Sequence, residues 1–420
     1  MVESGEISRI MNGVFPSQAN KKGLCFFSGS VNSVDYFEGW RKAGFECEIL
    51  NLATLQNSEA LTDNVKLGRI IAKGGYRFVF SINYFAILAE ACFAAGIPYI
   101  ACSIDSPVPM EKQETLKYNT TTLFLFDSAE VYLYNKLGYV NVHYMPLASP
   151  VDRYDSIKPT AEDWEKYGSQ VSFVGNLYEH KLYEYIGYLS DYKKGFFNAI
   201  IDYNVGRYDS YGFEDVLNLD LSRWMNEPKF IDAVFEGESV PGLNDVTVIE
   251  SKEITDIIDR VRYLTGKAIT NRERIILITM LSRHWKFKLY SPSSNELFSD
   301  VIEMGTVDYY EEMPGVFKCT EINLNNTLKS IKSGIPLRCL DVMGCGGFLL
   351  TNYQRDLDEY YKDGENIAIY RSLDEAFEKC DFYLKHENSR MRIANLGYET
   401  VRKYYSYDVI ISEIIRIARI

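Results

Sequence analysis

The chain has 420 residues, more than one ordinary hydrophobic core accommodates, so we expect two or three domains. Hydrophobic residues make up 46% of it and charged residues 25%, which is the balance of a folded globular protein. The net charge of −13 argues against a nonspecific nucleic-acid surface or an anionic membrane surface, and it leaves room for a local basic site for phosphate.

Cysteine, histidine and N-terminal patterns indicate a cytoplasmic protein without a structural metal. The eight cysteines form no CxxC pair and mostly lie in apolar runs, as reduced, buried cysteines do. The four histidines show no metal-ligand spacing, and the first ten residues lack a signal-peptide pattern. The longest apolar stretch, residues 85–102, contains Glu90 and is interrupted by Gly96 and Pro98. We therefore expect a buried helix and a strand there, and no membrane span.

The first 150 residues alternate apolar runs with helical patterns. Helical segments separate the expected strands, which lie at residues 24–30, 46–52, 77–84, 99–105, 123–128 and 142–148. This βαβ alternation predicts a parallel sheet with helices on both faces. Open α/β sheets bind ligands at the carboxyl ends of their strands, and that rim would carry Ser28, Gly29, Asn83, Tyr84 and Asp105.

A second α/β unit follows a polar segment with two prolines, residues 149–168. Its first strand is expected at 170–176, and the helical patterns after it indicate a helical insertion at about 180–270. The strand pattern resumes at residues 285–291, 316–322, 347–352 and 366–371. We therefore divide the chain into an N-terminal Rossmann-like domain (1–160), a second Rossmann-like domain (161–405) and a final helix (406–420).

The most informative stretch is SGIPLRCLDVMGCGG, residues 333–347. We expect a strand before it, a helix starting near Asn323, and then a Ser-Gly-Ile-Pro turn. Pro336 suits the first position of a new helix because its fixed φ is helical. The backbone N–H groups near Gly334 and Ile335, at the N-terminus of that helix, would attract an anion.

Two charged residues follow this turn on one helical face. Arg338 can form paired hydrogen bonds with phosphate oxygens, and Asp341 can accept hydrogen bonds from ribose hydroxyls. The alternative is an ordinary ion pair between residues three apart on a helix. The pattern alone is compatible with both interpretations.

This segment resembles the C-terminal domain of the CgeB-like (spore maturation) glycosyltransferases of the GT-B class. The likeness is carried by SGIPLRCLDVMGCGGFLLTNYQ and the tail YRSLDEAFEKCDFYLKHENSRMRIANLGYETVRKYYSYD, and it extends upstream to VFSINY, CFAAGIPYIACSIDSP and VSFVGNLYE. It covers most of the chain except about residues 200–270. The resemblance implies two Rossmann-like domains that face each other across a cleft, with a nucleotide-sugar donor on the C-terminal domain and a protein or glycan acceptor against the N-terminal one. It also implies that the final helix packs back toward the N-terminal domain.

The sequence departs from the family pattern at one position beside the turn. In related retaining enzymes, two glutamates separated by seven residues frame this turn, and the second contacts ribose. Asp341 stands at the second position, whereas the first falls on Ser333. One carboxylate is therefore missing, so the retaining mechanism does not transfer directly.

Asp105 is the candidate general base of an inverting transfer. It follows the expected strand 99–105 and precedes Ser106 and Pro107, which places it at the carboxyl end of a strand. A base at that position can take the proton of an acceptor hydroxyl. The alternative is an aspartate that caps the turn before a proline.

Further donor contacts are expected where the strands of the second unit end. Gly175 and Asn176 end its first strand, where small residues let a ligand approach the backbone, and Ser291 ends the strand that follows a basic cluster. Asn323, Asn325 and Asn326 surround the expected helix start, one as its N-cap and another as a contact to donor hydroxyls.

The sequence predicts no essential metal and no cofactor beyond the nucleotide-sugar substrate. Asp356-Leu357-Asp358 spells DxD, the metal-binding signature of another glycosyltransferase class, but it lies in a helical segment and is typical of an acidic first turn. Helix N-termini and basic side chains would stabilise the leaving diphosphate instead. Two alternatives remain beside a transferase: an epimerase or hydrolase of nucleotide sugars on the same fold, and a non-catalytic coat-associated binding protein.

Overall fold

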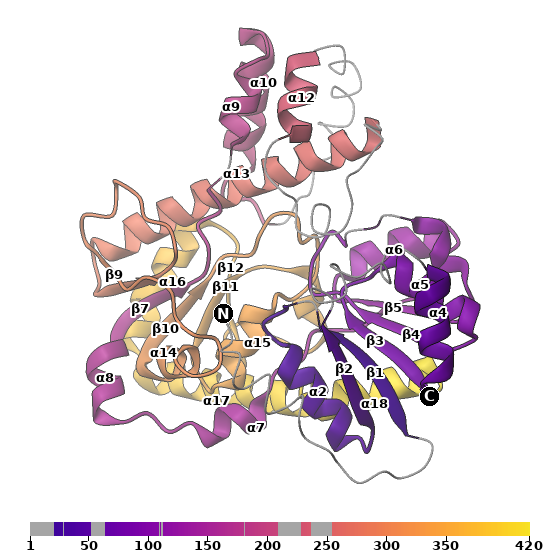
Figure 1. Ribbon diagram of the computed structural model, residues 1–420. Helices are drawn as coiled ribbons and strands as arrows, with labels where there is room; N and C mark the ends of the chain where they lie inside the picture. Colours follow the sequence, from indigo (N-terminus) through magenta and orange to yellow (C-terminus); the bar gives the residue numbers. More distant parts are fainter. Residues whose placement is uncertain are drawn as a thin grey trace. The chain divides into compact units, whose positions relative to one another are not determined.

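Two parallel sheets of six strands each, with helices packed against them, form the described part of the chain (Figure 1). The structure, a computed structural model, describes residues 21–27, 29–51, 64–108, 110, 112–179, 181–208, 228–236 and 254–420. These residues form two units, one of residues up to 150 with 403–420 and the other of residues 151–402. Each unit contains one sheet, so the α/β fold predicted from the alternating pattern is confirmed.

The N-terminal sheet has the strand order β2-β1-β3-β4-β5-β6. Its strands follow the predicted apolar runs, and β3 and β4 are buried along their whole length. In this unit the last helix of the chain packs on α2, where the Tyr407 ring lies 5.0 Å from the Tyr36 ring. The elements are β1 (Lys22–Phe27), α2 (Ser33–Lys42), β2 (Glu46–Asn51), α4 (Asn64–Lys73), β3 (Phe78–Ile82), α5 (Ala86–Ala95), β4 (Tyr99–Cys102), η1 (Gln113–Lys117), β5 (Thr121–Leu125), α6 (Ser128–Lys136), β6 (Val142–Tyr144) and α18 (Tyr407–Ala418).

The C-terminal sheet has the strand order β12-β11-β10-β7-β8-β9. This is the order of dinucleotide-binding sheets, in which the chain winds outward in both directions from two central strands. Here those strands are β7 and β10, which pair with each other. The elements are α7 (Val151–Ser156), α8 (Ala161–Tyr167), β7 (Ser169–Val174), β8 (Phe287–Tyr290), β9 (Val301–Glu303), α14 (Met313–Cys319), β10 (Thr320–Asn325), α15 (Leu337–Gly344), β11 (Leu349–Asn352), η2 (Arg355–Glu359), β12 (Ala368–Tyr370), α16 (Leu373–Lys385) and α17 (Glu387–Tyr404).

Between β7 and β8 the chain forms the helical insertion that the sequence predicted. It contains α9 (Leu182–Ile186), α10 (Asp191–Asn204), α12 (Pro228–Glu236) and the 29-residue α13 (Ile254–Ser282). The N-terminal half of α13 shares a core with α9, α10 and α12, whereas its C-terminal half packs into the core of the sheet through Leu277, Ile278 and Leu281. In Figure 1, α9, α10 and α12 accordingly stand beside the first half of α13. We call these four helices the helical layer.

Three details of the second unit differ from the sequence prediction. Residues 316–322, expected as a strand, begin inside α14, and β10 starts only at Thr320. An apolar run of this length fits either a buried helix or a buried strand, and Pro314 at the first turn of α14 is compatible with a helix start. No helix begins near Asn323, which lies within β10. The sequence also missed β9, a three-residue strand without a fully buried residue.

No helix in the described ranges has the length and apolar character that crossing a membrane requires.

Candidate functional site

The carboxyl ends of β7 and β10 lie next to each other at the centre of the C-terminal sheet. Here the winding direction reverses, and this is where open α/β sheets bind their ligands. Gly175 and Asn176 directly follow β7, Asn325 ends β10, and Ser291 directly follows β8. The structure therefore places these four predicted donor residues at one edge of the sheet.

Arg274, from α13, joins the two central strands at this edge. Its guanidinium donates hydrogen bonds to the backbone carbonyl oxygens of Asn176 and Asn326. The same group lies 4.4 Å from the centre of the Tyr178 ring, a distance typical of a cation–π contact. Burial lowers the pKa of Arg274, because its charged form has lost water. The sequence analysis missed this residue because its partners lie far away along the chain.

The asparagines of β10 hold backbone and side-chain groups inside the sheet. Asn323 donates to the carbonyl oxygens of Phe317 and Phe348 and accepts a hydrogen bond from the Ser172 hydroxyl. The prediction that one of these asparagines caps a helix is wrong for Asn323 and Asn325, because both lie in a strand. Asn325 is also buried and donates to the Thr351 hydroxyl over 2.9 Å. Asn323 thus joins groups inside the sheet, and of the two only Asn325 lies at the carboxyl edge of β10.

The Ser-Gly-Ile-Pro turn leads directly into α15. Pro336 is the residue before the helix, with φ −68° and ψ 150°, so the helix starts one residue later than predicted. The preceding Gly334 and Ile335 are buried. The N-terminus of α15 therefore begins at Leu337, where the first backbone N–H groups have no partner within the helix. Such an end attracts anions.

Arg338 and Asp341 form the ion pair that was the alternative interpretation. The guanidinium Nη1 lies 3.5 Å from Asp341 Oδ2, and the Arg338 side chain is 27% exposed whereas that of Asp341 is 2% exposed. The Asp341 carboxylate also accepts hydrogen bonds from the hydroxyls of Tyr154 (2.8 Å) and Tyr309 (3.3 Å). Burial and the nearby Asp341 charge raise the pKa of Tyr154. This geometry favours Arg338, the more exposed of the two, as the group that meets a ligand.

At the position of the missing glutamate, Ser333 is bonded to another acidic side chain. Its hydroxyl donates to Asp356 Oδ2 over 3.1 Å, and its carbonyl accepts from the Asp356 N–H over 3.0 Å. Asp356 and Asp358 lie in the first turn of η2, so the prediction that the DxD tripeptide is an acidic first turn is confirmed. Within the described ranges, no three His, Cys, Asp or Glu side chains come together as a metal site.

In the N-terminal unit, Asn83 and Asp105 meet at the carboxyl ends of β3 and β4. The Asn83 amide donates to Asp105 Oδ2 over 2.7 Å, and its oxygen accepts from the Ile104 N–H over 3.0 Å. Asn83 takes a left-handed backbone conformation (φ 63°) to do so. Burial raises the pKa of Asp105, and the Asn83 hydrogen bond partly opposes that rise. The predicted proximity of these two side chains is therefore observed.

The other residues predicted on this rim differ in their surroundings. Gly29 follows β1 with φ 87°, a conformation that favours glycine. Tyr84 is buried in the hydrophobic core, and its hydroxyl lies 2.6 Å from that of Thr115. Tyr84 is thus a core residue rather than a cleft residue. Ser28 lies outside the described residues.

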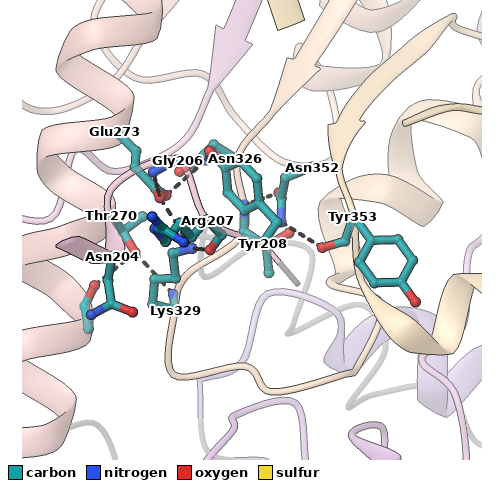
Figure 2. A network of polar contacts seen from close by, with 12 residues as sticks. Asn204, Gly206, Arg207, Tyr208, Thr270, Glu273, Asn326, Lys329, Asn352 and Tyr353 are labelled. Carbon is teal, nitrogen blue, oxygen red and sulfur yellow. Dashed lines mark hydrogen bonds and ion pairs between the residues drawn. The ribbon is translucent and has the colours of Figure 1, made fainter. Parts of the chain in front are cut away.

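Beside the carboxyl edge of the C-terminal sheet lies a buried polar network that the sequence analysis did not anticipate (Figure 2). It joins Glu273 of α13 to Asn326 and Lys329 of the segment after β10. The sequence signal for it was weak: a buried charge in the middle of an otherwise amphipathic helix. Burial raises the pKa of Glu273, although the Lys329 charge and three hydrogen bonds oppose that rise.

Residues 272–416, which include the turn and α15, match the model of a family described as glycosyl transferase-like. The whole chain has the architecture of a solved glycosyltransferase from Rickettsia africae, with a TM-score of 0.53 at 8% identity, over 96% of this chain and 98% of that one. The chain has the fold of a GT-B glycosyltransferase.

Two further solved structures share the fold of this chain. HepE from Anabaena, solved with UDP and glucose, matches with a TM-score of 0.50 at 11% identity over 94% of this chain and 98% of its own. Sucrose-phosphate synthase from Thermosynechococcus elongatus matches with a TM-score of 0.50 at 10% identity over 95% and 98%. At such identities the likeness concerns the fold alone. No curated protein sequence matches this chain.

Proposed function

We propose that this protein is a glycosyltransferase that takes its sugar from a nucleoside diphosphate sugar, with UDP as the first nucleotide to test. The proposal rests on the arrangement at the centre of the C-terminal sheet. There the carboxyl ends of β7 and β10 are neighbours, and the segment that follows β10 leads to α15. A sheet of this order binds nucleotides at this point, and the N-terminus of a helix suits a diphosphate. HepE, which shares the fold, was solved with UDP and glucose.

Arg338 would bind the diphosphate of the donor. It lies in the first turn of α15, and its side chain keeps 27% of its surface exposed although Asp341 is its ion-pair partner. Arg338 and the helix N-terminus together would stabilise the negative charge of the departing diphosphate. We therefore propose a metal-independent transfer, in which Asp341 and its two tyrosine partners hold Arg338 in place.

Asp105 would act as the general base. Its carboxylate would accept the proton of an acceptor hydroxyl while that oxygen attacks the anomeric carbon and the nucleoside diphosphate leaves. Burial raises the pKa of Asp105, which makes its carboxylate a stronger base than an ordinary aspartate. A base of this kind belongs to an inverting transfer, with a protein or glycan hydroxyl as the acceptor.

One experiment separates this proposal from its alternatives. The purified protein is incubated with UDP-, GDP-, ADP- and TDP-sugars, and released nucleotide is measured with and without candidate protein and glycan acceptors. A transferase releases nucleotide faster with an acceptor, and the sugar appears on it. A hydrolase releases nucleotide at the same rate without an acceptor, an epimerase converts the sugar without release, and a binding protein does neither. Any of the last three results would contradict the proposal.

A further inference from the structure

The helical layer holds the segment of residues 326–336, which we call the donor loop because it runs from β10 to α15. The central contact between the layer and the loop is an ion pair between Glu273 of α13 and Lys329 of the loop. The distance between Oε1 and Nζ is 3.2 Å. The Glu273 side chain has no exposed surface and that of Lys329 is 11% exposed. The Lys329 ammonium also lies 4.2 Å from the centre of the Tyr208 ring and donates to the Arg207 carbonyl oxygen. Figure 2 shows these groups converging between α13 and the loop.

Two hydrogen bonds and one close approach fix the loop to the same helix. The Lys329 N–H donates to the Thr270 hydroxyl over 3.0 Å, and the Asn326 amide donates to Glu273 Oε2 over 3.2 Å. Glycine at position 266 allows a close approach, because a Cβ there would lie 3.3 Å from the Ser330 nitrogen. Three successive turns of α13, at residues 266, 270 and 273, thus contact the loop.

The end of α10 is part of the same arrangement. The Gly206 N–H donates to Glu273 Oε1 over 2.8 Å, so one carboxylate oxygen serves both the helical layer and the loop. Replacing a buried ion pair with apolar residues often leaves a protein equally stable, so stability alone gives little reason for this pair. A buried ion pair whose groups are also hydrogen-bonded can instead hold a loop in one position.

We propose that Glu273 and Lys329 are positioning residues for the donor, and that the helical layer is a part of the donor site. This inference rests on the proposed function, because the loop leads to the turn and to Arg338. The loop is held at its other end by the hydrogen bond from Ser333 to Asp356. Fixing both ends sets where the N-terminus of α15 presents its N–H groups to a diphosphate.

The first test changes the charges. The probe is UDP, with GDP and ADP in parallel, and its Kd is measured by calorimetry for the full-length wild type, Glu273→Gln, Lys329→Met and the double variant. We expect each single variant to raise the Kd about tenfold or more. The double variant should recover the melting temperature, since no buried charge is left unpaired, and should still bind weakly because the loop has lost its anchor.

The matched control breaks a different ion pair of the same unit, between β10 and α17. Arg390 and Glu321 pair over 2.7 Å near the amino end of β10, away from the donor loop. Glu321→Gln should lower the melting temperature without changing the Kd. Equal Kd values for Glu273→Gln and the wild type, or full recovery of UDP binding in the double variant, would show that the pair is merely structural and overturn the inference.

A milder pair of variants keeps the test valid if the charge variants do not fold. Thr265 and Thr270 are both buried in α13, and both donate to the carbonyl four residues earlier, but only Thr270 accepts from the loop. Thr270→Val should raise the Kd about three- to tenfold while Thr265→Val leaves it unchanged. Equal effects would contradict the inference. If the wild type bound neither these three nucleotides nor TDP, the proposed function would fail and this inference with it. If the wild type bound one of them and the variants bound it equally well, the inference alone would be overturned.

Discussion

Asp341 offers the sharpest test of how the candidate donor site is held together. Its carboxylate is buried and accepts two tyrosine hydrogen bonds in addition to the Arg338 ion pair. Hydrogen bonds to charged groups contribute about 1.5–3 kcal/mol each, and neutral ones about 0.5–1.5 kcal/mol. The 2.8 Å bond from Tyr154 should lie in the first range, and the longer 3.3 Å bond from Tyr309 should contribute less.

From these values, Asp341→Ala should lower the free energy of unfolding of the C-terminal unit by about 2–4 kcal/mol. Asp341→Asn keeps an acceptor for Tyr154 but loses the charge, so it should cost about 1–2 kcal/mol. Tyr154→Phe should cost about 1.5–3 kcal/mol. In a double-mutant cycle, Asp341→Ala and Tyr154→Phe should be less than additive by the free energy of their shared bond.

Urea titrations followed by circular dichroism measure these losses, with the transitions of the two units fitted separately. Calorimetry with UDP on the same variants then shows whether Asp341 supports Arg338 or contacts the nucleotide directly. A supporting Asp341 predicts that Asp341→Asn weakens UDP binding less than Arg338→Ala does. Additive losses in the cycle, together with a larger UDP effect for Asp341→Asn, would refute the reasoning and show that the carboxylate binds the nucleotide directly.

Four further outcomes follow from the site. Arg338→Ala should weaken binding of UDP far more than binding of uridine, because only UDP carries the diphosphate; equal losses in calorimetry would count against a phosphate role. Asp105→Asn should abolish transfer and retain UDP binding. Because burial raises the pKa of Asp105, the base is protonated, and transfer declines, at a higher pH than for an ordinary aspartate. Asn83→Gly suits the positive φ and removes a hydrogen bond that lowers this pKa, so the acid limb of the rate profile should move to still higher pH; an unmoved limb would exclude Asp105 as the titrating group. Finally, transfer should persist after treatment with a chelator, and its loss with rescue by one divalent ion would show that a metal stabilises the leaving group.

The sequence predicted the sheets well because their signal is local. Strands such as β3 and β4 are short, fully buried apolar runs between helical patterns, and no distant residue is needed to recognise them. The boundary between α14 and β10 could not be predicted from the sequence. Residues on both sides of it are buried, so periodicity does not distinguish a helix from a strand there.

The site was predicted where strand ends meet at one edge of a sheet and where residues are neighbours along the chain. Arg338 and Asp341 lie three residues apart on one helix, and the ion pair between them was foreseen as an alternative. The contacts of Asp341 with Tyr154, and of Glu273 with Lys329, join residues distant in sequence. No spacing rule identifies such partners, since the topology of the sheet brings them together.

The continuity of α13 limits how this enzyme can be re-engineered. One helix of 29 residues, about 43 Å long, belongs to the core of the helical layer at one end and to the core of the sheet at the other. A chimaera that exchanges the layer between related enzymes therefore cannot be cut at the ends of helices. The junction must fall inside α13, before Gly266, so that the recipient keeps the residues that contact its own donor loop. A cut after Glu273 would separate the loop from its native partners and should yield a folded chain with impaired donor binding.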